Sequence, residues 1–440
     1  MKWYNLSVMS IQILLILIFA YIIIIGTLNE KLFHIQSDIA LVLFSSVLSV
    51  IILVINHFFP NPYLFRLIGT FGHFNFRDYL MEGMLCFMLF AGASKVNMGK
   101  FKTNLRPICL LAFVSTVLSS LLYGCLMYLA AVIFKLPLDF WTCVLLGCVV
   151  SPTDPIAATG ILNKIGLSKN VCSVIENESL FNDGTGVTMF IFVQSIITRS
   201  SESNVGILLL KEIVGAAAVA LLLSFLMFQL VKISRNPIRN ILIALMNVLL
   251  VYMVCEHFGF SGVLASVICG FYFSYKMDKL QRLEAVVDPH NFYDHFWEIL
   301  EGILNAALFV MIGFMLLGAK ASVYLPIIIP VALVALILSR VGGVTISTIL
   351  TGHNIPGNYN LPEFVTLMTW SALKGGLSLA LALETAEYLQ EPQYLIVLNV
   401  AFITILFTVL VQGMTVRKVY NGLEKHKAIR LHNQAGGDTK

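Results

Sequence analysis

Four polar side chains stand close together in an otherwise apolar stretch of the chain. Glu178, Ser179, Asn182 and Asp183 belong to the segment Glu178-Ser179-Leu180-Phe181-Asn182-Asp183. In an α-helix, residues four positions apart lie on one face, so Ser179 is beside Asp183 and Glu178 is beside Asn182. Hydroxyl, amide and carboxylate oxygens are ligands that a hard cation prefers, and one carboxylate neutralises a monovalent cation. The spacing therefore predicts a monovalent-cation site around Asp183.

The carboxylate of Asp183 can also accept a proton. Burial favours the protonated form of a carboxyl group, whereas a bound cation favours the ionised form. A site that holds either a proton or a cation, but not both, exchanges one for the other by mass action. We expect this role for Asp183, deep in the apolar segment 172–198. Glu176 lies near the end of that segment, where we expect a solvated acidic side chain.

Two apolar segments contain residues that interrupt a helix. One holds Ser151-Pro152-Thr153-Asp154-Pro155, whose two prolines remove amide donors and clash with preceding carbonyl groups. The other holds Lys374-Gly375-Gly376. Irregular backbone at membrane depth is tolerated where it lines a cavity, and it exposes helix ends that can hold charge. We expect Asp154 to cap one half-helix and Lys374 to complement the carboxyl end of another. Simple kinks without a ligand are the alternative.

Further polar side chains fall at membrane depth. Arg340 cannot lose its proton and therefore needs a carboxylate partner, for which Glu178 is the candidate. Glu301 and Asn305 are one helical turn apart, and Glu82 stands near the start of another apolar segment. For these three residues, a structural tether and ion ligation remain open alternatives.

The composition places the elements that carry these residues in a membrane. Of the 440 residues, 58% are hydrophobic and only 12% are charged, and the mean hydropathy is +0.88. A soluble fold of this size could not bury so much apolar surface. The net charge of +4 is spread along the chain, which does not suggest nucleic-acid binding. The eight cysteines form no C-x-x-C pair, so we interpret them as apolar packing residues.

A helix needs about 20 apolar residues to cross a bilayer. This criterion predicts thirteen spans, an all-α polytopic fold, at residues 5–26, 38–58, 79–97, 107–134, 141–162, 172–198, 207–231, 239–257, 260–276, 297–319, 324–350, 362–386 and 394–416. Most Lys and Arg residues fall on the side of the C-terminal tail, so the positive-inside rule predicts a cytoplasmic C-terminus and an external N-terminus. The tail, 417–440, is short and basic, and we expect its end to lack regular structure.

The motifs together resemble the cation:proton antiporter family, in the branch of the NhaP-like sodium/proton exchangers. The resemblance runs in order from about residue 80 to residue 420. Besides the segments around Asp154 and Asp183, it is carried by Phe296-Trp297-Glu298, Asn305, Phe309-Val310-Met311-Ile312-Gly313, Ser339-Arg340-Val341 and Val411-Gln412-Gly413-Met414-Thr415-Val416-Arg417.

The resemblance implies a fold, a division of the helices into a moving core and a scaffold, and an activity. The fold would have two inverted repeats whose broken helices cross at the centre, within an antiporter domain at 1–416. A core around 107–198 and 324–416 would move against scaffold and dimer helices. The protein would be a homodimer in lipid that exchanges Na⁺ or Li⁺ for H⁺ by alternating access, with no cofactor and no enzymatic activity.

The resemblance also implies roles for single residues. The counterpart of Asp183 binds the ion and the proton, and those of Thr153 and Ser179 complete a Na⁺ site. The counterparts of Glu178 and Arg340 form a buried ion pair. An Asn–Asp pair, here Asn182 and Asp183, is typical of electroneutral members, so we expect one Na⁺ per proton.

Two features depart from the family pattern. Lys374 stands where this branch usually has arginine, which affects the prediction of cation preference. The tail is too short for the regulatory domain of animal exchangers, which indicates a microbial plasma-membrane protein. A K⁺/H⁺ antiporter is the main alternative. A cation channel is less well supported because no filter-like loop repeats, and a hydrolase using Asp154 and Asp183 lacks a nucleophile motif.

Overall fold

The computed structural model describes residues 11–60, 76–154, 166–198, 205–234, 236–283, 289–352 and 355–437. Over these ranges the chain forms helices and no strand, which confirms the predicted all-α membrane fold. Nine helical stretches in them are long and apolar enough to cross a membrane. Each of the thirteen predicted spans contains at least one described helix, but several of these helices are short, so the count of thirteen crossings stays a prediction.

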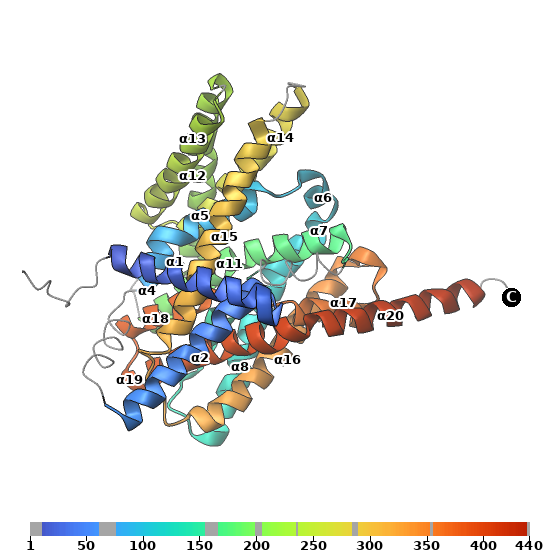
Figure 1. Ribbon diagram of the computed structural model, residues 1–440. Helices are drawn as coiled ribbons and strands as arrows, with labels where there is room; N and C mark the ends of the chain where they lie inside the picture. The colour runs from blue at the N-terminus through green and yellow to red at the C-terminus, as the bar shows by residue number, and fades with distance from the viewer. Residues whose placement is uncertain are drawn as a thin grey trace, which may run out of the picture.

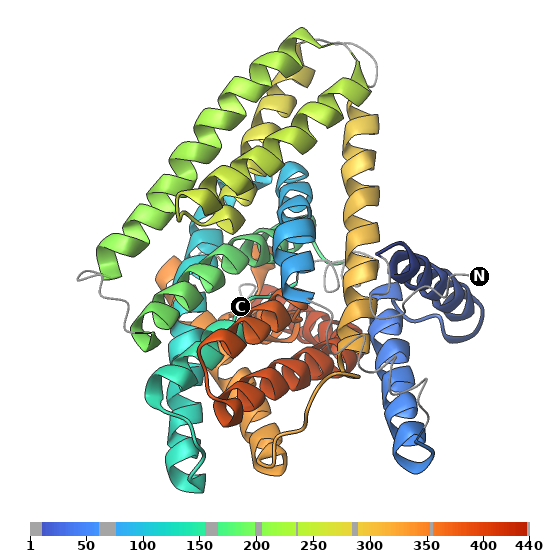
Figure 2. The same cartoon turned by 90° about the vertical axis from the view of Figure 1, so that its left-hand side faces the viewer.

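One group of helices comes from the N-terminal end and the middle of the chain. It consists of α1 (Ile11–Leu28), η1 (Asn29–Phe33), α2 (Ser37–Phe58), α4 (Phe76–Asp78), η2 (Tyr79–Met84), α5 (Leu85–Ser94), α12 (Val205–Ile233), α13 (Pro237–His257), α14 (Gly262–Leu283) and α15 (Pro289–Met315). α14 packs against α5, α12 and α13, while α15 packs against α2 and α5. Both views show α12 and α13 side by side, projecting from the rest of the molecule (Figures 1 and 2).

The second group holds the segments with the candidate site residues. It consists of α7 (Leu105–Cys109), η3 (Leu110–Ser115), α8 (Thr116–Phe134), α9 (Phe140–Val150), α11 (Lys169–Ile197), α16 (Leu325–Thr351), α17 (Leu361–Trp370), α18 (Gly376–Glu384), α19 (Glu391–Leu406), η6 (Phe407–Gln412) and α20 (Gly413–Gly437). Three short helices, α6 (Met98–Thr103), η4 (Pro356–Asn358) and η5 (Thr385–Glu387), lie in connections. α8 packs against α9 and α16, and α11 packs against α9.

Glycine lets α8 and α9 approach closely. A Cβ atom built on Gly147 of α9 would lie 2.0 Å from the carbonyl oxygen of Ser120 in α8. A Cβ atom on Gly124 of α8 would in turn lie 2.7 Å from Cα of Val144. Close helix packing through small residues replaces the hydrophobic driving force that is absent between helices in lipid.

Local sequence explains where the broken helices begin and end. The side chain of Asp139 accepts hydrogen bonds from the amides of Trp141 and Thr142, which caps the start of α9. α9 ends at Val150, two residues before Pro152. Asn360 and Glu363 form a reciprocal capping box at the start of α17. The second half of the predicted span 141–162, from residue 155, lies outside the described residues.

The C-terminal tail continues the last apolar helix. α20 runs without interruption from Gly413 to Gly437, so the expectation that the tail ends without regular structure is wrong up to that residue. Arg430 donates to Glu363 of α17 over 3.0 Å and to the carbonyl oxygen of Asn358 over 2.7 Å. Tyr359 donates a hydrogen bond to Glu424. These contacts attach α20 to the start of α17, and Figure 1 shows α20 running outward to the C-terminal end.

Candidate functional site

The two interrupted segments meet at the centre of the second group of helices. Residues 151–154, after α9, and residues 372–375, between α17 and α18, are not helical. The amide of Asp154 donates to the carbonyl oxygen of Leu373 over 2.7 Å, which joins the two segments directly. The amide of Lys374 donates to Thr408 Oγ1 over 3.0 Å. Backbone groups released by the breaks are therefore partly satisfied by each other and by η6.

Opposite charges face the helix ends at this crossing. Lys374 Nζ donates to the carbonyl oxygen of Ser151, the C-cap residue directly after α9, over 3.0 Å. A Cβ atom on Gly375, the N-cap residue directly before α18, would lie 3.0 Å from Asp154 Oδ2. A cation beside a helix C-terminus and an anion beside a helix N-terminus are both favourable. Each interrupted segment thus supplies the charge that complements the helix end of the other.

Asn182 of α11 connects the crossing to the acidic segment. Its Oδ1 accepts the amide of Thr153 over 3.1 Å, and its Nδ2 donates to Thr153 Oγ1 over 2.6 Å. The same Nδ2 lies 3.1 Å from Glu178 Oε1. Thr153 Oγ1 is also 2.7 Å from Ser179 Oγ. All four side chains are buried, so the asparagine and the two hydroxyls form one fixed network.

Arg340 of α16 lies against Glu178. Its Nη1 is 2.9 Å from Glu178 Oε1, and the two residues are only 6% and 1% exposed. The sequence-based pairing of these two residues matches the geometry. A buried carboxylate that is already neutralised by arginine is not available as a free charge for a transported ion.

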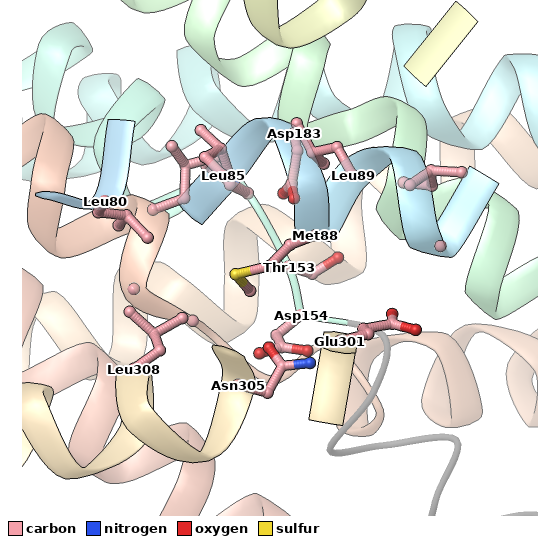
Figure 3. A pocket seen from close by; sticks show the side chains of 16 residues that line it. Leu80, Leu85, Met88, Leu89, Thr153, Asp154, Asp183, Glu301, Asn305 and Leu308 are labelled. Atoms are coloured by element: carbon pink, nitrogen blue, oxygen red, sulfur yellow. The ribbon is translucent and has the colours of Figure 1, made fainter. Parts of the chain in front are cut away.

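Asp183 lines a cavity of about 60 Å³, which is room for a few water molecules. Thr153, Asp154, Asn305 and Glu301 also line it (Figure 3). Asp183 enters this cavity from α11, Asp154 from the break after α9, and the other two from α15. The cavity therefore brings together charges and neutral oxygens from several helices.

The remaining sequence-based candidates differ in their surroundings. Glu301 forms an ion pair with Lys95, just after α5, a partner that the sequence did not indicate. Asn305 lines the cavity, and neither its Oδ1 nor its Nδ2 has a hydrogen-bond partner among the described residues. Glu176 is half-buried near the start of α11. The side chain of Glu82 lies outside the described residues.

A cation binds most readily where oxygen atoms converge on an uncompensated carboxylate. Thr153 lines the cavity together with Asp183, and its hydroxyl contacts that of Ser179 within a buried network that Asn182 holds in place. Among the described residues, no group of three or more His, Cys, Asp or Glu side chains is arranged to hold a metal ion. The donor set suits a monovalent cation better than a transition metal.

Known proteins match this chain over most of its length. The family model described as "Sodium/hydrogen exchanger, transmembrane" matches residues 14–422. The Na(+)/H(+) antiporter NhaP of Pseudomonas aeruginosa is 30% identical over 81% of this chain and 85% of its own length. The Na(+)/H(+) antiporter NhaH of Halobacillus dabanensis is 29% identical over 71% of this chain and 75% of its own.

A solved structure has the same fold. The sodium proton antiporter MjNhaP1 from Methanocaldococcus jannaschii, at pH 8, superposes with a TM-score of 0.73. The match covers 94% of this chain and 99% of that protein, at 20% sequence identity. At that identity, the likeness concerns the fold.

Proposed function

The chain belongs to the sodium/hydrogen exchanger family, and we propose that it exchanges Na⁺ for protons at Asp183. It is an integral membrane protein of the Na⁺/H⁺ antiporter class, a secondary transporter and not an enzyme.

One observation favours Asp183 over the other charged residues of the site as the group that exchanges Na⁺ and protons. The charges around the crossing are compensated, since Glu178 pairs with Arg340, Lys374 contacts the end of α9 and Asp154 faces the start of α18. Asp183 lines the cavity and has no ion pair within 4.0 Å among the described residues. It is the carboxylate left to take up a proton or a cation.

In the proposed cycle, Na⁺ binds between the carboxylate of Asp183 and the hydroxyl oxygens of Ser179 and Thr153. Asn182 holds Thr153 in place through two hydrogen bonds, and Glu178 in turn anchors Asn182. Release of Na⁺ leaves a desolvated carboxylate, which takes up a proton from the opposite side. No resident cofactor is needed, because Na⁺ and H⁺ are the cargo.

Alternating access requires the site to move relative to the helices that face it. We assign the moving core to residues around 107–198 and 324–416, and the scaffold to the remaining helices. The inner wall of the cavity, with Asp183 and Asp154, belongs to the core, while Glu301 and Asn305 belong to the scaffold. We further propose a homodimer in a microbial plasma membrane, with the N-terminus outside and the α20 tail in the cytoplasm.

Purified protein in liposomes with a trapped pH dye tests the proposal. Addition of Na⁺ or Li⁺ to vesicles with an acidic lumen should release protons, whereas K⁺ should release few. A response to K⁺ that equals or exceeds the Na⁺ response would assign the protein to K⁺/H⁺ exchange. A cation current that persists without proton movement would instead indicate a channel.

A further inference from the structure

A second cavity lies one helical turn beyond the Asp183 cavity, along the same helices. We call it the outer cavity; its volume is about 260 Å³. Val187 of α11 and Leu381 of α18 line it, and each stands four residues after a lining residue of the first cavity, Asp183 or Leu377. The outer cavity also reaches Glu384, at the end of α18 that lies away from the tail-bound α17. It therefore opens towards the side of the membrane opposite the tail.

The positions where the two linings meet are apolar. Leu80 and Leu377 line the first cavity, while Val187, Val263 and Leu381 line the outer one. All five are buried and belong to one hydrophobic cluster. A layer of this kind excludes ions, so an ion on the outer side would have to wait there until the core moves.

The charged lining of the outer cavity is strongly acidic. One arginine, Arg77, stands there with four carboxylates, those of Asp78, Glu212, Glu256 and Glu384. Arg77 is already shared: its Nε is 3.6 Å from Glu384, and its Nη1 is 3.8 Å from Asp78 and 3.0 Å from the nearby Glu387. In the described part of the chain, no ion pair within 4.0 Å joins a lysine or arginine to Glu212.

Glu212 is the least satisfied of these carboxylates. It projects from α12, an apolar helix, and is only 5% exposed. Its Oε2 has no hydrogen-bond partner among the described residues. A buried carboxylate without a partner is costly, so the site favours any cation that can enter it.

Glu256, at the end of α13, lies on the same cavity and is held in place. Its Oε1 accepts the amide of Gly262, at the start of α14, over 2.9 Å. Ser261 and Tyr252 also line the cavity. Among the described residues, no group of three or more His, Cys, Asp or Glu side chains is arranged to hold a metal ion, so we consider this cavity as a site for the monovalent cation that the exchanger family transports.

We propose that the outer cavity is a second binding site for Na⁺, in which Glu212 and Glu256 hold the ion on the outer side of the apolar layer. This inference rests on the proposed exchange at Asp183. It adds a second site, on the side opposite the tail, from which Na⁺ reaches the Asp183 site or to which that site releases Na⁺. The outer cavity raises the local Na⁺ concentration on the side opposite the tail, and it has no effect on Na⁺ that arrives from the side of the tail.

Transport measured separately from each side of the membrane tests whether the outer cavity affects only Na⁺ on the side opposite the tail. Right-side-out and everted membrane vesicles present the two faces of the protein separately to external Na⁺. At low ionic strength, Glu212→Gln should raise KM for Na⁺ about fivefold or more at the outer face, and leave kcat and KM at the tail face within about twofold. Glu256→Gln should also raise the outer KM, because it removes a negative charge from the cavity. The glutamine oxygen can still accept the hydrogen bond from the Gly262 amide, so the side chain should stay in place. Unchanged outer KM, or equal changes at both faces, would overturn the proposal.

A matched control removes a different external carboxylate. Glu391 is exposed, pairs with Lys320 over 3.4 Å and does not line the outer cavity. Glu391→Gln changes the net charge as Glu212→Gln does, and it should leave both KM values unchanged. An equal rise of the outer KM in Glu391→Gln would show that general surface charge, and not the outer cavity, is responsible.

Binding of radioactive Na⁺ separates this inference from the proposed function. Purified Asp183→Asn lacks the inner carboxylate and should retain weak, saturable Na⁺ binding, which the added change Glu212→Gln should abolish. Loss of all binding in Asp183→Asn would refute the outer site even if the wild type exchanges ions. Binding that depends on Glu212, in a wild type without exchange, would refute the proposed function and leave the outer site standing.

Discussion

At the scale of residues, the candidate site contains several compensated charges and one carboxylate, that of Asp183, for which the described residues give no ion pair within 4.0 Å. Arg340 and Glu178 neutralise each other in a buried pair. Lys374 faces the C-terminal end of α9, and Asp154 faces the N-terminal end of α18. What remains is the carboxylate of Asp183, at the edge of a cavity with room for water. A proton and a cation can compete only for a charge that is not already compensated.

Replacement of Asp183 by asparagine should abolish exchange. The amide has nearly the same shape but can neither hold a proton nor neutralise Na⁺, so the expected rate in liposomes falls to that of protein-free vesicles. Thermal stability should change little, because Asp183 forms no ion pair within 4.0 Å in the described part of the chain. Substantial Na⁺-driven proton flux from the purified variant would show that another group carries the reaction.

The buried Glu178–Arg340 pair should affect stability differently when one or both partners are replaced. Removal of either partner leaves a buried charge uncompensated, at a cost of about 3–5 kcal/mol, whereas removal of both can be nearly neutral. The melting temperatures of Glu178→Gln and Arg340→Met should therefore both lie below that of the double variant. The Glu178 variant should also lose cation affinity, because Asn182 donates to Glu178. Additive losses would mean that the two side chains are not coupled.

At the scale of elements, glycine allows α9, which precedes one of the breaks, to pack closely against α8. Gly147→Ala should destabilise the protein, because the new methyl group would lie 2.0 Å from the carbonyl oxygen of Ser120. Overpacking of this kind costs about 1–3 kcal/mol or more, and it should lower the melting temperature. Gly302→Ala, where no atom lies within 4 Å of the new group, is the control and should be neutral or stabilising. Equal melting temperatures for the two variants would contradict the close packing.

Sequence patterns predicted the elements better than the contacts between them. Pro152 and the Gly375–Gly376 pair mark the two breaks because proline and glycine act on the local backbone. The ion pair between Glu178 and Arg340 could be anticipated, because a buried guanidinium must find a carboxylate. The partner of Glu301 could not, since Lys95 stands in a connection far away in the sequence.

The outer cavity could not be predicted from the sequence for a similar reason. Glu212 follows Lys211 near the start of a predicted apolar span, and an acidic residue near a span end is usually solvated. It is buried because α13 and α14 pack against α12 and bring Glu256 and Ser261 to the same cavity. The only signal in the sequence was a carboxylate inside a stretch predicted to cross the membrane.

At the scale of the whole molecule, the arrangement bears on whether the cycle moves net charge. Asn182 stands where a second aspartate would supply a second titratable group, so one Na⁺ for one proton is the simplest stoichiometry. The exchange rate should then vary less than about twofold between liposomes clamped at different voltages with valinomycin and K⁺, once K⁺ is shown not to be a substrate. A steep voltage response with a net current would contradict this, and Lys374→Gln would then test whether Lys374 carries the extra proton.

The attachment of α20 to the start of α17 has a mechanical consequence. α20 has 25 residues, so it extends for about 37 Å as one rigid rod. Arg430 and Glu424 fasten this rod to residues 358–363, immediately before and within one half of a broken helix. Because these contacts lie in the C-terminal half of the rod, a displacement of the start of α17 and a displacement of the tail must occur together. A ligand that immobilised the tail would therefore also restrain the start of α17.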